Sequence, residues 1–172
     1  PQDIEKAIML IKIDRIRKID VGSVTKIDGE KLSSPHYFIE TSGVGIDAHI
    51  QQHIKEWEEG SMTSLVELVG KMSSFTPRKL KLVIDGEELE TEASMVTVAN
   101  APYTGANLKL APSARLNDHR LTVSLYKMNK WQLAKYFTTM KMSGKTDLRK
   151  VKTYQATHVK VMSDKPRLLH VD

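Results

Sequence analysis

The sequence has 172 residues, 40% of them hydrophobic, with no cysteine, a net charge of +5 and a pI near 9.3. This size supports one domain, or at most two small ones, and the lack of cysteine excludes a disulfide framework, a thiolate metal site and a cysteine nucleophile, as is typical of a reducing cytoplasm. No apolar run approaches the ~20 residues that span a bilayer, so any membrane contact is expected to be peripheral, and the positive charge favours anionic partners such as phosphates, acidic lipid headgroups or nucleic acid.

The first part of the sequence predicts a helix, two strands and then more helix. Residues 1–13 have the spacing of an amphipathic helix, whose apolar face consists of Ile4, Ala7, Ile8 and Ile11. Residues 16–27 and 36–44 are rich in β-branched and aromatic side chains, which predicts an early antiparallel pair of strands. Residues 47–75 have helical spacing with a break near Gly60, which indicates two helices or one kinked helix.

A hairpin is predicted in the middle of the chain. Residues 79–84 alternate between polar and apolar side chains, and Asp85-Gly86 is a strong signal for a type I′ turn. Residues 87–92 return along the first strand, and the apolar run 95–99 follows directly. These segments are therefore expected to form a three-stranded meander.

The last part of the chain is expected to combine strands with one helix. The predicted strands are residues 108–110, 121–126, 157–162 and 168–171. Asn129 is a suitable N-cap for a helix that continues to Met142 and ends at Gly144. Together with the earlier elements, this predicts an α+β fold dominated by antiparallel sheet.

Three segments match a family pattern in the expected order. The first, FIETSGVGIDA at residues 38–48, has the form of a strand-to-helix GxGxDA junction. The second, VTVANAPYTGANLKLAPSARLNDHRLTVSLY at residues 96–126, contains an Asn turn, a short glycine stretch, a P-x-A motif and an acidic turn between two strands. The third, KPRLLHVD at residues 165–172, leads to an aspartate in the position that begins a DGE motif. In this order the segments resemble the carboxy-terminal lobe of the diacylglycerol kinase and sphingosine kinase-like lipid kinase family.

The resemblance implies a two-lobed enzyme with its active site between the lobes. Residues 1–172 would form one lobe, the mainly antiparallel, β-sandwich-like α+β second lobe of the lipid kinase and NAD kinase-like fold, with two or three helices. The ATP-binding lobe, with a GGDGT loop, would precede Pro1, so the chain alone is expected to be inactive. The implied reaction is the ATP- and Mg²⁺-dependent phosphorylation of diacylglycerol or a related lipid alcohol in phospholipid metabolism. The implied partners are the lipid substrate and the missing lobe, and a homodimer is a further candidate assembly.

The resemblance also assigns roles to residues near the cleft. Asp172 would be the catalytic residue, because a carboxylate is the natural acceptor for the proton of the attacking hydroxyl. Asp47, with Gly43 and Gly45 before it, is expected to bind the headgroup of the acceptor lipid. From the residues alone, Asp47 also suits a helix N-cap, the glycines suit close backbone packing, and Asp172 suits a frayed strand end.

The acidic turn is the candidate metal site. By the same resemblance, Asp118 would give its side chain, and Arg115 and Arg120 their backbone carbonyl oxygens, to a structural Mg²⁺, which prefers oxygen donors. An ordinary hydrogen-bonded turn is the alternative interpretation of Asp118. Two departures from the family pattern put the local loop geometry in question. The glycine-rich stretch is reduced to residues 104–106, and His119 replaces a glycine that would adopt positive φ more readily.

A basic run surrounds the predicted carboxy-terminal helix. Its members are Lys127, Lys130, Lys135, Lys141, Lys145, Arg149, Lys150 and Lys152. Near an anionic membrane surface each exposed basic group contributes about 1 kcal/mol to binding, so one interpretation is a cytoplasmic protein that associates peripherally with membranes. The other is a solvated helix face over a core that contains Trp131 and Phe137.

Two other classes of function fit parts of the sequence. A non-catalytic, peripheral lipid- or phosphate-binding module would suit the reduced glycine stretch and His119. A nucleic-acid-binding β domain would suit the charge, but with 6% aromatic residues and no RNA-binding signature nucleic acid is not expected as a partner. The NAD kinases share the two-lobe plan but have different second-lobe motifs. His49 and His53 are spaced i,i+4 without the internal glutamate of a zinc protease, so a metalloprotease is excluded.

Overall fold

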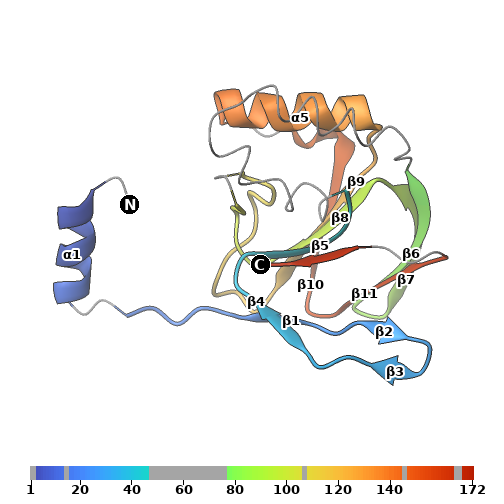
Figure 1. The fold of residues 1–172 in the computed structure, drawn as a ribbon, viewed down its shortest axis with the longest axis horizontal. Coiled ribbons are helices and arrows are strands. Elements are labelled where there is room, and N and C mark those ends of the chain that lie inside the picture. Colours follow the sequence, from blue (N-terminus) through green and yellow to red (C-terminus); the bar gives the residue numbers. More distant parts are fainter. Residues whose placement is uncertain (1–2, 14–15, 47–76, 106–107, 145–146, 165–167) are drawn as a thin grey trace.

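The computed structural model describes residues 3–13, 16–46, 77–105, 108–144, 147–164 and 168–172. The helices predicted over residues 47–75 lie outside these ranges. The main body has three layers, in which a helix covers one face of a five-stranded sheet and a three-stranded sheet covers the other (Figure 1). This arrangement confirms the predicted α+β, β-sandwich-like class.

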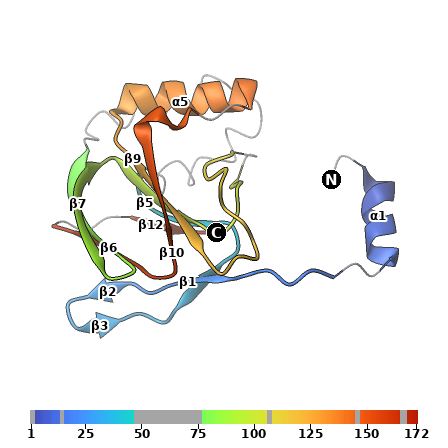
Figure 2. The ribbon, with the colours of Figure 1, turned by 180° about the vertical axis from the view of Figure 1, so that it is seen from behind.

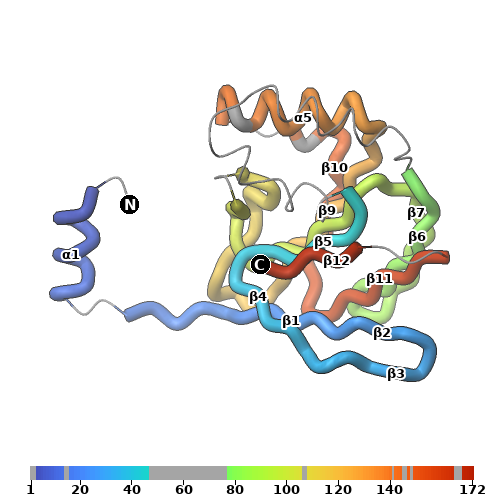
Figure 3. Tube along the Cα trace, in the orientation of Figure 1, coloured from blue at the N-terminus to red at the C-terminus, as the bar shows by residue number. Residues whose placement is uncertain are grey.

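The five-stranded sheet forms the middle layer. Its strands are β5 (Thr41–Gly45), β8 (Met95–Ala99), β9 (Leu121–Tyr126), β10 (Val151–Ala156) and β12 (Leu169–Val171). They lie in the order β10-β9-β8-β5-β12, and every neighbouring pair is antiparallel. The strand closest to the carboxyl end therefore forms one edge of the sheet, next to β5 (Figure 3).

The three-stranded sheet is built on the predicted hairpin. Strands β6 (Arg78–Ile84) and β7 (Glu87–Ala93) pair along their whole length, and β11 (Val159–Ser163) pairs with the other side of β6. Asp85 and Gly86 have φ angles of 47° and 92°. Both turn residues therefore have the positive φ of the predicted type I′ turn.

Two short strand pairs extend from the main body. Strand β1 (Gly22–Val24) pairs antiparallel with β4 (His36–Phe38), which confirms the predicted early pair over a shorter length. Between them, β2 (Ile27–Asp28) and β3 (Lys31–Leu32) form a small hairpin. The β1–β4 pair packs closely, because a Cβ added to Gly22 would collide with the ring of Phe38.

Helix α5 (Lys130–Ser143) has the predicted caps. The side chain of Asn129 accepts from the N–H of Gln132, the side chain of Gln132 accepts from the N–H of Asn129, and Gly144 ends the helix with φ 63°. This reciprocal pattern satisfies two N–H groups that a helix start leaves without partners. A 3₁₀ turn, η1 (Leu148–Lys150), leads from the helix towards β10. Among the helices in the described ranges, none has the length and apolar character needed to cross a membrane.

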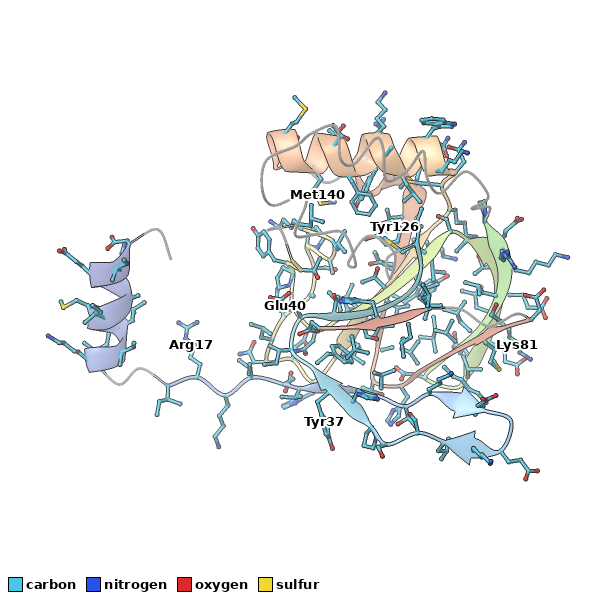
Figure 4. All side chains as sticks on the ribbon, in the orientation of Figure 1. Arg17, Tyr37, Glu40, Lys81, Tyr126 and Met140 are labelled. Carbon is cyan, nitrogen blue, oxygen red and sulfur yellow. The ribbon has the colours of Figure 1, made fainter. Side chains whose placement is uncertain are left out.

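Two cores hold the layers together. The core between α5 and the five-stranded sheet contains Ile46, Met95, Leu108, Leu110, Tyr126, Met128, Leu133, Tyr136, Phe137, Met140 and Val151. Figure 4 shows Tyr126 and Met140 in this layer. The core between the two sheets contains Leu80, Leu82, Ile84, Ala93, Val96, Val123, Leu125 and Ala156. Because alternate residues of the middle sheet enter opposite cores, its central strands are buried on both faces.

Helix α1 (Ile4–Lys12) is confirmed but buries none of its residues. The Asp3 side chain caps it by accepting from the N–H of Lys6. The helix lies apart from the β layers, at the end of an extended linker (Figure 2). Its exposed apolar side chains include Ile4, Ile8, Met9, Leu10 and Ile11. A nine-residue helix is marginally stable alone in water, so its apolar face is a surface without a partner in the described part of the chain.

Three details of the predicted strand pattern are wrong. Strand β8 does not continue the hairpin but pairs with β5 and β9, because its apolar side chains are needed in the middle of the larger sheet. Residues 108–110 form no strand beyond an isolated bridge from Thr104 to Leu108, and instead place two leucines in the core. Strand β10 was not predicted, because an edge strand needs few apolar residues and Val151–Ala156 is mostly polar.

Asp85 joins the β6–β7 turn to the loop between β10 and β11, and this contact gives a test of the fold. Its carboxylate accepts from Thr157 N at 2.9 Å, Thr157 Oγ1 at 2.9 Å and His158 N at 2.7 Å. These bonds, with the backbone N–H of His158 first, lower the pKa of Asp85. A lowered pKa in the folded state adds stability above the unfolded pKa of about 4, and this stability is lost as the pH falls through the folded value.

We therefore expect Asp85→Asn to lower the free energy of unfolding at pH 7, with a difference from wild type that shrinks as the pH falls below about 4. Asparagine tolerates the positive φ of this turn, so the substitution tests the carboxylate rather than the backbone. Urea denaturation at several pH values measures the effect, with Asp28→Asn at the end of β2 as the matched control. A constant difference at all pH values would contradict the prediction.

Candidate functional site

The Asp172 carboxylate holds the turn between β4 and β5. It accepts hydrogen bonds from three consecutive backbone N–H groups, those of Ile39 at 3.1 Å, Glu40 at 3.0 Å and Thr41 at 2.8 Å. The N–H of Asp172 in turn donates to the carbonyl oxygen of Thr41 at 3.3 Å. Both carboxylate oxygens are thus engaged by the backbone. The predicted catalytic residue therefore acts in this structure as a clasp between the end of β12 and the β4–β5 turn.

Strand pairing places this clasp beside the predicted headgroup glycines. In the register of β5 and β12, Gly43 lies opposite His170 and Ser42 lies opposite Val171. The Ser42 hydroxyl donates to the carbonyl oxygen of His170 at 2.8 Å. The carboxyl end of β12 is thereby fixed against the strand that carries the GxG motif.

The two glycines occupy tightly packed positions. Gly43 lies within β5, between Thr97 on β8 and His170 on β12. Gly45 has φ 106°, and an added Cβ would collide with the carbonyl oxygen of Ser94. This geometry requires glycine at position 45 for backbone conformation and for packing. Asp47, the third predicted headgroup residue, lies outside the described residues.

Glu40 has a fixed backbone and a free side chain. Its carbonyl oxygen accepts from Asn100 N at 2.9 Å and from Ala101 N at 3.1 Å, and its own N–H donates to Asp172. Within the described ranges, its carboxylate makes no hydrogen bond or ion pair. Partial burial raises the pKa of Glu40, the Asp172 carboxylate raises it further, and His170 offsets part of the rise. Figure 4 labels Glu40 close to the carboxyl end of the chain.

Asn100, at the end of β8, connects the linker after α1 to the β4–β5 turn. Its side-chain N–H₂ group donates to the carbonyl oxygens of Ile39 and Asp20, each at 2.9 Å. Asn100 is fully buried, and its side-chain oxygen has no hydrogen-bond partner among the described residues. Nearby, the hydroxyls of Thr41 and Thr104 lie 3.0 Å apart. The Asn turn predicted from the sequence is thus a direct support of the β4–β5 turn.

The predicted metal turn offers oxygen donors. The Oδ1 atom of Asp118 accepts from Arg120 N at 3.1 Å, and Oδ2 has no partner in the part of the chain described. No group of three or more acidic, histidine or cysteine side chains gathers anywhere in the described ranges. Mg²⁺ commonly combines one carboxylate with carbonyl oxygens and water. Asp118 Oδ2 is thus open to a cation, and the Mg²⁺ site with the carbonyl oxygens of Arg115 and Arg120 stays a prediction.

His119 adopts the left-handed backbone conformation that the glycine of the family pattern would adopt more readily. Its φ is 57°, a left-handed conformation that costs a non-glycine residue roughly 1–2 kcal/mol. Two contacts with Asp20 offset this cost, since Nδ1 lies 2.9 Å from Oδ1 and the backbone N–H donates to Oδ2 at 2.8 Å. Asp20 also donates its N–H to the carbonyl oxygen of Leu116 at 2.6 Å. The turn is therefore tied to the linker after α1.

An open hollow of about 400 Å³ lies beside the contact between the linker and the acidic turn. Its lining residues are Arg17, Lys18, Ile19, Leu116 and Asn117. The linker therefore does not pack closely along the turn, and the bonds of Asp20 fasten it there. Figure 4 shows Arg17 on the extended segment that leads to α1.

Sequence reasoning missed Glu40 and Asp20. Glu40 immediately precedes the GxG strand, and an acidic side chain at the start of a functional motif was the available signal. Asp20 had no such signal, because its partners Asn100 and His119 are 80 and 99 residues away in the chain. Contacts between such distant residues depend on the tertiary structure.

A family model matches most of the chain. The model described as "YegS C-terminal NAD kinase beta sandwich-like domain" matches residues 41–172. Two curated proteins named "Diacylglycerol kinase", from two strains of Mycobacterium tuberculosis, are each 24% identical over 148 residues, which cover 83% of this chain and 46% of the relative. The chain thus spans about half the length of the curated relatives it matches.

Solved structures support the same fold. A diacylglycerol kinase from Bacillus anthracis str. Sterne superposes with a TM-score of 0.63 at 19% identity, covering 99% of this chain and 52% of the other. A putative diacylglycerol kinase from the same strain gives a TM-score of 0.67 at 20% identity, covering 99% and 55%. At this level of identity the likeness establishes the fold alone.

The charged carboxylate of Glu40 should lower the free energy of unfolding at neutral pH, because its pKa is raised in the folded state. A carboxyl group with a raised folded pKa contributes stability below its unfolded pKa of about 4.3, and this contribution is lost as the pH rises through the folded value. We expect Glu40→Gln to raise the free energy of unfolding at pH 7 and to give no gain below about pH 4. Urea denaturation at both pH values tests this, with Glu30→Gln in the exposed β2–β3 turn as control. A glutamine variant less stable than wild type at pH 7 would refute it.

The His119 contact can be separated from its backbone strain. His119→Ala removes the imidazole and keeps the unfavourable φ, whereas His119→Gly removes both, so the glycine variant should be more stable by about 1 kcal/mol. Both variants should show faster amide hydrogen exchange at residues 17–20, measured by mass spectrometry, because Asp20 loses one of its partners. Equal stability of the two variants, or unchanged exchange, would count against this account.

Proposed function

Because this chain belongs to the YegS C-terminal NAD kinase beta sandwich-like domain family, we propose that it is the second lobe of a lipid kinase that transfers a phosphoryl group from ATP to diacylglycerol or a related lipid alcohol. The curated relatives are named diacylglycerol kinases, which supports this class of reaction. The chain covers about half of their length, so the complete activity requires the rest of the protein.

The observation that carries the proposal is the meeting of all three motif segments. Asp172, from the third segment, accepts from Glu40 of the first, and Asn100 of the second donates to both Ile39 and Glu40. Asp172 lies 132 positions along the chain from Glu40, and Asn100 lies 61 from Ile39. Segments that the sequence comparison selected for their resemblance to a kinase therefore form one hydrogen-bonded cluster.

Phosphoryl transfer depends mainly on alignment and charge stabilisation. In our proposal this lobe supplies the surface against which the acceptor lipid is aligned, formed by the β4–β5 turn and the start of β5. Asp172 fixes that surface through three N–H groups, which assigns it to positioning. Mg²⁺, when bound, would neutralise charge, and Asp118 with the carbonyl oxygens of Arg115 and Arg120 would hold a structural ion. ATP would be held mainly by the other lobe.

Helix α1 provides the contact with the other lobe in this proposal. Its apolar side chains are exposed and it buries none of them in the described part of the chain. The solved relatives align over 99% of this chain yet are about twice as long. A nucleotide-binding lobe packed on α1 would bury this face and close the site. The isolated chain should then be inactive.

Peripheral contact with an anionic membrane surface is also part of the proposal. Phe137 lies in the core as predicted, but Trp131 is 60% exposed, which corrects its predicted place. The Nζ atom of Lys130 lies 5.6 Å from the centre of the Trp131 ring. An exposed indole beside lysines suits the headgroup region of a bilayer, and it would hold a cytoplasmic enzyme near its lipid substrate.

A non-catalytic lipid- or phosphate-binding module is the second candidate function. It is favoured by one observation, the engagement of both Asp172 oxygens by the backbone, which leaves this carboxylate poorly placed to take a proton. A protein of this kind would bind the lipid without turnover.

Phosphate transfer by the protein that combines this chain with its nucleotide-binding lobe tests the proposal. We expect ATP-dependent labelling of a lipid alcohol, with activity reduced about ten- to a hundredfold in Asp172→Asn, because an amide cannot accept all three N–H bonds. In Asp118→Ala a higher Mg²⁺ concentration should be needed for the same rate.

Asp28→Asn, far from the cluster, is the control and should leave the rate unchanged. Lipid binding without phosphate transfer by the folded wild-type protein, with Mg²⁺ present, would favour the binding module. Transfer that is insensitive to Asp172→Asn would show that the clasp has no role in the reaction.

A further inference from the structure

The hollow between the linker after α1 and the acidic turn combines two cations with an apolar lining. Its residues are Arg17, Lys18, Ile19, Leu116 and Asn117, and its volume is about 400 Å³. This volume lies within the roughly 300–1,000 Å³ of small-molecule sites. Most of the lining surface is apolar, as expected where Ile19 and Leu116 meet the aliphatic stems of two basic side chains. The hollow therefore offers positive charge and apolar surface together.

The two cations of the hollow have no acidic partner. Arg17 and Lys18 are exposed, and neither makes an ion pair with any residue in the described ranges. Asp20, which follows on the linker, uses both carboxylate oxygens for His119. Asp118, on the acidic turn, uses one oxygen for a backbone N–H of its own turn. An anion that enters the hollow would therefore meet two unpaired positive charges.

Hydrogen bonds hold the two walls of the hollow together. The N–H of Asp20 donates to the carbonyl oxygen of Leu116 at 2.6 Å, and the Asn100 side chain donates to the carbonyl oxygen of Asp20 at 2.9 Å. Figure 4 shows the Arg17 side chain projecting from the linker, a short distance along the chain from this attachment. A ligand would therefore bind walls that are already joined, which lowers the ordering cost of binding.

These features fit a phosphate monoester on an aliphatic chain. The planar guanidinium of arginine matches phosphate oxygens with two parallel hydrogen bonds, and lysine adds a compact positive charge. A phosphate monoester carries a charge of about −1.5 to −2 at neutral pH, which two cations balance, whereas a phosphate diester carries a single charge. The apolar lining gains free energy when an aliphatic chain covers it, and inorganic phosphate would leave it exposed to water.

We infer that this hollow is a binding site for a lipid phosphate. Arg17 and Lys18 bind the monoester head, and Ile19 and Leu116 contact the adjoining aliphatic part. The hollow shares no residue with the β4–β5 turn or β5, where the acceptor is proposed to lie. A lipid phosphate is the product class of the proposed reaction, and this link rests on the proposed function. The binding itself does not depend on it.

Isothermal titration calorimetry without ATP tests the inference in the protein that combines this chain with its nucleotide-binding lobe. The compounds are dihexanoylphosphatidate (monoester), dihexanoylphosphatidylglycerol (diester), inorganic phosphate and octyl glucoside, each below its micelle-forming concentration. We expect the monoester to bind about tenfold more tightly than the diester, and octyl glucoside to bind weakest. Arg17→Gln and Lys18→Gln should each weaken phosphatidate binding about five- to tenfold, because each removes a charged donor.

Two further variants separate head from chain and site from surface. Ile19→Ser should weaken phosphatidate binding about threefold and leave inorganic phosphate unaffected, because it alters only the apolar lining. Lys31→Gln, in the exposed strand β3, is the matched control and should change nothing. Equal affinity for monoester and diester would contradict the assigned ligand. Unchanged phosphatidate affinity in the Arg17→Gln, Lys18→Gln double variant would overturn the site, while phosphate transfer by the same protein would still support the proposed function.

Methyl NMR decides the location independently of affinity. The methyl resonances of Ile19 and Leu116, assigned from Ile19→Val and Leu116→Met, should shift when dihexanoylphosphatidate is added. Ile27 and Leu32, which are 51% and 69% exposed on the β2–β3 hairpin, are the internal control and should keep their resonances in place. No shift at Ile19 and Leu116, or equal shifts at all four residues, would refute a site in the hollow.

Discussion

Three backbone N–H groups that converge on one carboxylate are the interaction on which the rest of the site depends. Asp172 joins the end of β12 to residues 39–41, across 131 to 133 positions of the chain. Closing so long a stretch of chain carries an entropic cost, and the pairing of β12 with β5 brings the two segments together. These bonds fix the backbone of the turn before β5, from which the Glu40 side chain projects.

The buried polar groups connect this clasp to the rest of the fold. Asn100 is fully buried at the end of β8 and donates to both the β4–β5 turn and the linker at Asp20. Asp20 in turn receives the two contacts of His119. The linker that carries α1, the acidic turn and the β4–β5 turn are therefore parts of one hydrogen-bonded network. Under the proposed function, a lobe that packs on α1 would thus be connected to the β4–β5 turn through Asp20 and Asn100.

The sequence predicted the elements whose signals are local. Such signals come from residues that are neighbours in the sequence. They identified the capping residues of α5, the Asp85-Gly86 turn and the three motif segments. The partners of β8 and the edge strand β10 were not, because strand pairing is decided by which faces must be buried in the complete sheet. For the site, the sequence selected Asp172, Gly43 and Gly45, and the structure places Asp172 at the end of the strand that pairs with β5, which carries both glycines. The sequence could not show that the Asp172 carboxylate accepts hydrogen bonds from three backbone N–H groups. It also could not show that the neighbouring Glu40 carboxylate makes no hydrogen bond within the described residues.

Amide hydrogen exchange at Ile39, Glu40 and Thr41, measured by NMR in wild type and in Asp172→Ala, tests the clasp most directly. Our account predicts slow exchange of these three amides in wild type and strongly accelerated exchange in the variant, while the amides within α5 keep their wild-type rates. Fast exchange of the three amides in wild type, or unchanged rates in the variant, would contradict the claim that Asp172 organises the site.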